Sequence, residues 1–177
     1  MLLTEFFGFF SLSAFIMWGF LMAFFFNIFV YTLDVKRKTT LLLSSFIMMV
    51  SYTISDYFFT WLSIKVKIYL DWAIYDIMTI TALLGVCFII KKTTPSFLYL
   101  IIGLTINSIF FLLMYIDMYI NNNQEHWILW DLYIYTVNSI DLIMIIALIV
   151  DRDFLGLHTL KSKLISLFKT TELNQIQ

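Results

Sequence analysis

The chain has 177 residues, of which 62% are hydrophobic and 13% charged, and its mean hydropathy is +0.92. Soluble domains carry about 25% charged residues, so this composition indicates an integral membrane protein. A bilayer core about 30 Å thick takes about 20 apolar residues per helix, so the length allows about four to six crossings and excludes a large catalytic head. A formal net charge of −1 gives no basic surface for nucleic acid, and we expect no nucleic-acid partner.

Five apolar stretches alternate with charged or turn-forming breaks along the chain. The predicted spans cover about 6–31, 41–64, 68–90, 97–120 and 127–150. Each is long enough to cross a bilayer as a helix. Pro95 stands near the start of the fourth span, where its missing N–H is tolerated. The sequence therefore predicts an all-α, polytopic membrane bundle of about five transmembrane helices, occupying residues 1–150.

The basic residues predict the orientation of these spans. Lys and Arg residues cluster at 36–38, at 91–92 and after residue 150, whereas only Lys65 and Lys67 lie at the opposite ends of the spans. Because cytoplasmic loops carry an excess of positive charge, the N-terminus is predicted outside and the C-terminus in the cytoplasm. We expect the protein in a bacterial inner membrane. Four tryptophans near the predicted outer ends favour the same orientation: Trp61, Trp72, Trp127 and Trp130.

The segment 151–177 follows the last predicted span. Its apolar residues recur at three- and four-residue spacing, with polar residues opposite, which predicts an amphipathic interfacial helix followed by a short tail. Lys161, Lys163 and Lys169 on this helix either bind the anionic membrane surface or dock a cytosolic protein partner.

Six aspartates are the chemically most informative residues of the spans, because no Lys or Arg lies within any span to pair with them. An ionised carboxylate at mid-bilayer costs about 2.5 to 3.5 kcal/mol even on the most lenient scale. Each acid must therefore face water, lie near an interface, carry a proton or bind a cation. The six are Asp56, Asp71, Asp76, Asp117, Asp131 and Asp141.

The six divide by depth. Asp71, Asp117 and Asp131 lie within about two turns of the predicted outer ends, which at about 1.5 Å per residue is shallow enough to reach water, and they predict a solvated outer vestibule. Three others lie deeper. The predicted cation- or proton-binding set comprises Asp56, Asp76 and Asp141, together with Asn138, which shares one quadrant of its helix with Asp131 and Asp141.

Small polar residues also mark two other spans, and two interpretations of them stay open. They either continue the polar lining or hold helices together through hydrogen bonds. They are Ser44, Ser51 and Ser55 on the second span and Thr105, Asn107 and Ser108 on the fourth.

Catalytic motifs give no support for an enzyme. Nucleophile-elbow, zinc-protease and phosphate-loop patterns are missing from the sequence, and glycine accounts for only 5 residues. We therefore expect no catalytic residues, no cofactor and no metal site. The single cysteine, Cys87, allows no intrachain disulfide.

Two hypotheses of function follow. The first is a small, homo-oligomeric membrane protein whose acidic intramembrane cavity handles cations or protons, as a channel or transporter does. The second is a non-transporting sensor, immunity or phage-defence subunit that recruits a cytosolic partner through residues 153–177. In the second case the deep aspartates would be interhelical hydrogen-bond sites.

Overall fold

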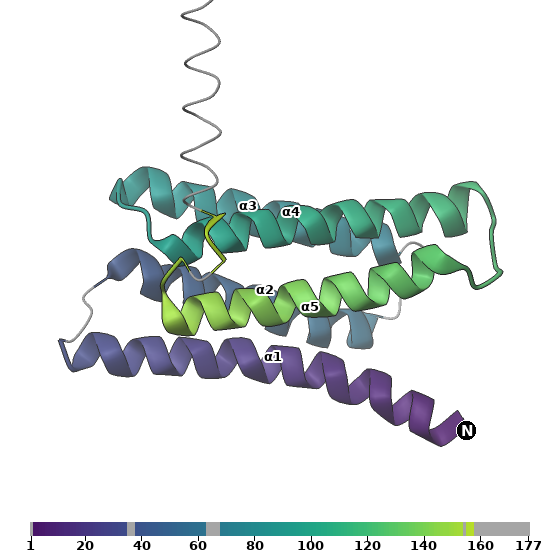
Figure 1. Cartoon of the computed structure of the whole chain (residues 1–177), viewed down its shortest axis with the longest axis horizontal. Helices are drawn as coiled ribbons and strands as arrows, with labels where there is room; N and C mark the ends of the chain where they lie inside the picture. Colours follow the sequence, from purple (N-terminus) through teal and green to yellow (C-terminus); the bar gives the residue numbers. More distant parts are fainter. Residues whose placement is uncertain (1, 35–37, 63–67, 154, 158–177) are drawn as a thin grey trace, which may run out of the picture.

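Five long helices make up most of the described chain, and Figure 1 shows them side by side along the long axis of the molecule. The computed structural model describes residues 2–34, 38–62, 68–153 and 155–157. No strand occurs within those residues. The predicted all-α bundle is thus confirmed. Its helices are α1 (Leu2–Thr32), α2 (Thr39–Leu62), α3 (Ile68–Ile90), α4 (Pro95–Tyr115) and α5 (Ile128–Val150), and a π-helical turn, η1 (Ile116–Ile120), continues α4.

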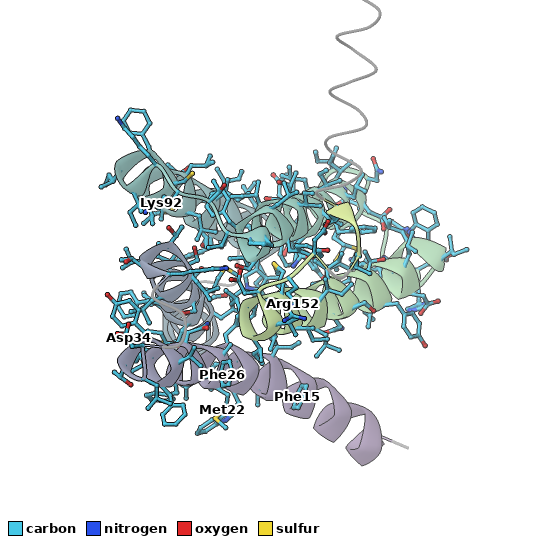
Figure 2. The ribbon with its side chains drawn as sticks, turned by 60° about the vertical axis from the view of Figure 1, so that its left-hand side comes forward. Phe15, Met22, Phe26, Asp34, Lys92 and Arg152 are labelled. Carbon is cyan, nitrogen blue, oxygen red and sulfur yellow. The ribbon has the colours of Figure 1, made fainter. Side chains whose placement is uncertain are left out.

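Within the part of the chain that the structure describes, four helices contain a segment long and apolar enough to cross a bilayer, as an integral membrane protein requires. The four segments are Ala14–Thr32, Ile68–Ile90, Pro95–Ile120 and Ile128–Val150, and α2 adds a shorter apolar stretch, Thr39–Ser55. The outer faces are apolar as well. Phe15 and Met22 of α1 are 58% and 63% exposed, and Figure 2 shows Met22 on the side of α1 that faces away from the other helices. Such a face suits lipid.

Left-handed residues end several of the helices. Asp34, Lys91, Asn122 and Asp151 all have positive φ, and they follow α1, α3, η1 and α5. Asp and Asn tolerate this conformation better than most residues do, and a left-handed residue is a common way to end a helix. At Asp151 the backbone N–H still donates to Ala147 O at 2.9 Å, which completes the last turn of α5.

The helices form a closed ring. Each packs against the next along the chain, and α5 returns to pack against α1. One stripe of each helix therefore faces inward, as the regular spacing of Ile16, Phe20, Ala23 and Asn27 on α1 shows. The crossing of α4 and α5 is close at Gly103, where an added Cβ would lie 2.6 Å from Met144 Sδ.

The interior of the ring is layered. One apolar cluster, the aliphatic layer, includes Met48, Leu83, Leu104, Met144 and Leu148. A second cluster, the aromatic layer, lies toward the other end of α3, α4 and α5 and contains Ala73, Phe111, Met114, Tyr133 and Val137, with Tyr69 and Trp72 packed against it.

Polar side chains lie between these two layers and beyond each of them. Along α4, Asn107 comes between Leu104 of the aliphatic layer and Phe111 of the aromatic layer. Along α5, Asp141 comes between Val137 and Met144 in the same way. The centre of the bundle is therefore a polar layer enclosed by apolar side chains on both sides.

Candidate functional site

Four polar residues from four different helices form the polar layer, which we call the central cluster: Tyr52 of α2, Asp76 of α3, Asn107 of α4 and Asp141 of α5. Asp141 is 6% exposed and accepts two hydrogen bonds on the same oxygen. Tyr52 OH donates to its Oδ1 at 2.5 Å, and Asn107 Nδ2 donates to the same atom at 2.8 Å. The ring of Phe20 on α1 packs on Tyr52 with centroids 4.2 Å apart, so all five helices position this group.

Interhelical hydrogen bonds fix Asp76 at the same depth. One turn away on one side, Thr79 Oγ1 bonds Ser51 Oγ of α2 at 2.5 Å. One turn away on the other side, the carbonyl of Ala73 accepts from Ser108 Oγ of α4 at 3.2 Å. Asp76 itself is 9% exposed and lies within electrostatic range of both Asp141 and Tyr52.

Two acceptor atoms of the central cluster have no hydrogen-bond partner among the described residues. They are Oδ2 of Asp76 and Oδ1 of Asn107, and both atoms are inaccessible to solvent. A buried polar atom without a partner costs about 1 to 3 kcal/mol, and more where the group is charged. Native proteins contain few such atoms, and each calls for a specific explanation.

The two acids of the central cluster also lack a compensating positive charge. Two carboxylates lie near one another between apolar layers, while the five predicted spans contain no Lys or Arg. Burying an ionised carboxylate without a compensating charge is strongly unfavourable. A positive species, either a proton or a cation, is the simplest partner for the pair.

Asp117 lies at one end of the bundle, on η1, and is 6% exposed. Its Oδ2 accepts from the indole N–H of Trp127 at 2.8 Å and from that of Trp130 at 3.0 Å. Asn123 Nδ2 adds contacts of 3.2 and 3.3 Å to the two carboxylate oxygens. The carboxylate predicted to line an open vestibule is thus enclosed by donors, and it joins the α4–α5 connection to the end of α4.

Asp151 lies at the opposite end and is 3% exposed. Its Oδ2 pairs with Lys38 Nζ at 2.5 Å, and its Oδ1 accepts from Ser96 Oγ at 3.1 Å. Close by, Tyr99 OH donates to Asp153 at 2.7 Å and accepts from the backbone N–H of Leu155 at 2.8 Å. These contacts join the start of α2, the start of α4 and the end of α5.

The other residues predicted as site residues are not brought to the central cluster by any described contact. Asn138 donates to Ile134 O of its own helix at 2.7 Å, so that donor is not directed at Asp141. Asp131 is exposed and lies 3.3 Å from His126 Nε2, and Asp71 is partly exposed in the first turn of α3. The side chain of Asp56 and the residues Lys161, Lys163 and Lys169 lie outside what the structure describes, as does most of the predicted amphipathic helix.

Sequence reasoning left Tyr52 out of the site and left the role of Asn107 open. Tyr52 is one of 10 tyrosines in an aromatic-rich chain, so its residue type carries little signal. Its spacing carries more, because Tyr52 follows the buried residues Ser44 and Met48 at intervals of four residues on α2.

Comparisons with known protein families, with curated proteins and with solved structures found no match to this chain.

Proposed function

We propose that this integral membrane protein handles protons or small cations, and that the central cluster lies on their path. The observation that carries the proposal is the pair Asp76 and Asp141, which are buried at one depth with no basic partner in the spans and with an unpartnered oxygen on Asp76. Buried acids of this kind serve as relays and ion sites in membrane proteins.

The two apolar layers support this proposal. A conducting path needs a polar site inside the membrane and a barrier that prevents a continuous leak of water and ions. Along α4 and α5, the aliphatic layer lies between the central cluster and the Asp151 end, and the aromatic layer lies between the central cluster and the Asp117 end. The Asp151 end also carries Lys38, Lys91, Lys92 and Arg152, so the positive-inside rule favours the cytoplasm for that end.

All four residues of the central cluster come from a single chain. We keep the homo-oligomer as a proposal about assembly alone, which size-exclusion chromatography with light scattering tests.

Flux measurements in liposomes test the proposed function. Purified protein is reconstituted, and uptake of protons, Na⁺ and K⁺ is followed for the wild type and for Asp141→Asn. We expect flux of one of these ions in the wild type and a loss of about tenfold or more in the variant, because an amide neither binds nor releases a proton and carries no charge.

Asp131→Asn is the matched control, because it makes the same change on the same helix at a position whose side chain is 56% exposed. It should conduct like the wild type. Liposomes that stay tight around folded wild-type protein would contradict the proposed function and turn attention to the non-transporting interaction role of residues 153–177.

A further inference from the structure

The hydrogen-bond donors of the central cluster all point at one carboxylate. Tyr52 contributes its hydroxyl hydrogen and Asn107 contributes its amide N–H₂, and both go to Asp141 Oδ1. Hydrogen bonds from two donors stabilise the ionised form of a carboxylate. The arrangement therefore favours an ionised Asp141, whose negative charge is stabilised by two neutral hydrogen-bond donors.

Such an arrangement is poorly suited to a metal cation. Hard cations bind oxygen ligands, and Na⁺ or Ca²⁺ would need the oxygens of several residues turned toward a common point. Here the amide turns its N–H₂ group, which is not a ligand, toward Asp141. Within the described residues, no group of three or more His, Cys, Asp or Glu side chains gathers in a way that could hold a metal.

Asp76, unlike Asp141, has a buried oxygen that accepts no hydrogen bond from the described residues. Its Oδ2 is buried without a partner, and Oδ1 of Asn107 is a second buried acceptor of the cluster that lacks a donor. An ionised carboxylate only accepts hydrogen bonds, whereas a carboxylic acid has an O–H group that donates one. A proton on Asp76 therefore supplies the hydrogen-bond donor that these two buried acceptor atoms lack.

The charge balance leads to the same assignment. With both acids ionised, the enclosed layer carries two negative charges, and one proton reduces this to a single charge that Tyr52 and Asn107 solvate. Two neighbouring buried carboxylates commonly share one proton for this reason. Among the described residues, the phenol groups of Tyr52 and Tyr133 are the other titratable side chains within electrostatic range of both acids.

We propose that the ion handled by the central cluster is the proton, that it resides on Asp76, and that Asp141 is its ionised partner. This inference rests on the proposed function and narrows it to one ion. The step is a protonation alone: Asp76 releases H⁺ toward one side and becomes a carboxylate, then takes up H⁺ from the other side. Only the O–H bond breaks and forms, and no other reactant is required.

Infrared spectroscopy of the reconstituted protein tests the position of the proton. A protonated carboxylic acid has a carbonyl stretch that is separate from the carboxylate bands and shifts in D₂O. We expect this band in the wild type and in Asp131→Asn, its disappearance in Asp76→Asn, and its return in Asp76→Glu, which restores the acid. Persistence of the full band in Asp76→Asn would overturn the assignment to Asp76.

Ion selectivity tests the identity of the ion in the same liposomes. A pH-sensitive dye in the lumen reports proton uptake driven by a K⁺ diffusion potential, and separate assays follow Na⁺ and K⁺. We expect proton uptake that falls about tenfold or more in Asp76→Asn, as the loss of a relay acid implies, with partial recovery in Asp76→Glu.

The failures of the two proposals are distinguishable. Flux of Na⁺ or K⁺ that depends on Asp76 would overturn the proton assignment and leave cation handling intact. An absence of any flux would contradict the proposed function itself, whatever the infrared band shows. Circular dichroism confirms that each variant is folded before its flux is interpreted.

Discussion

Buried aspartates lie both at the ends of this bundle and at its centre, and their surroundings differ. Asp151 has an ion pair with Lys38 and a hydroxyl donor, and Asp117 has three N–H donors. At the centre, Asp141 has only neutral donors and Asp76 has an oxygen with none. The polar groups at the ends stabilise helix connections, whereas two buried oxygens at the centre, on Asp76 and Asn107, accept no hydrogen bond. Departures from full satisfaction are expected at functional sites.

The largest loss of stability should come from the end that holds Asp117. Asp117→Ala removes the acceptor of two indole N–H groups and one amide, so we expect a loss of about 2 to 4 kcal/mol in the free energy of unfolding. Denaturant unfolding in detergent, followed by tryptophan fluorescence, measures it. Asp71→Ala, at the partly exposed start of α3, is the control and should cost less than about 1 kcal/mol. Equal losses would show that the indole contacts do not stabilise this end.

At the Asp151 end, the two partners of the ion pair should differ in how much stability is lost when each is replaced. Asp151→Asn keeps the left-handed backbone accessible and removes the charge, and we expect a loss of about 1 to 3 kcal/mol. Lys38→Ala should fall at the upper end of this range, because the Asp151 side chain is 0% exposed and would stay buried without its cation, whereas Lys38 is 43% exposed and can regain water. Thermal unfolding of both variants measures the order. The reverse order would show that the ion pair is not what holds this end.

Packing around the aliphatic layer should have an intermediate effect. Gly103→Ala places a methyl group 2.6 Å from Met144 Sδ and 3.1 Å from Ile140 Cγ2, and such overpacking costs about 1 to 3 kcal/mol. Gly85→Ala is the matched control on α3, since nothing lies within 4 Å of its added Cβ. That variant should be stabilised by about 0.5 to 1 kcal/mol, the usual gain of Ala over Gly within a helix. Both values come from thermal unfolding, and a destabilised Gly85→Ala would contradict the packing described for α3.

The smallest effect is expected at the surface. Asp131 and His126 form a pair in which both side chains are more than half exposed. Asp131→Asn should therefore change the free energy of unfolding by less than about 0.5 kcal/mol, since exposed pairs contribute little. A loss as large as that of Asp151→Asn would mean that the exposed Asp131 contributes as much to the free energy of unfolding as the buried Asp151 does.

Much of the architecture follows from the sequence because hydropathy and charge determine where helices enter and leave a membrane. The predicted span 68–90 coincides with α3, and Asp76 and Asp141 are recognisably deep within their helices. Their partners could not be predicted, because Tyr52 and Asp141 are 89 residues apart and meet only through the rotation and pairing of the helices.

The end clusters were harder to predict for a related reason. Trp127 and Trp130 have the positions of interfacial anchors, and nothing in their spacing indicates that both indoles donate to Asp117 across a ten- to thirteen-residue separation. Lys38 belongs to a basic group that orientation alone explains, and Asp151 follows the last span. Their pairing across 113 residues depends on the closed ring of helices.

The most direct test of this distinction compares the unfolding midpoints of Asp76→Asn and Asp151→Asn in the same detergent. If Asp76 serves proton handling and not stability, Asp76→Asn leaves the free energy of unfolding within about 0.5 kcal/mol of the wild type, because the amide, like the protonated acid that it replaces, is neutral and can donate a hydrogen bond. Asp151→Asn should be clearly destabilised. A loss in Asp76→Asn as large as that in Asp151→Asn would contradict this account and make the central acid a structural one.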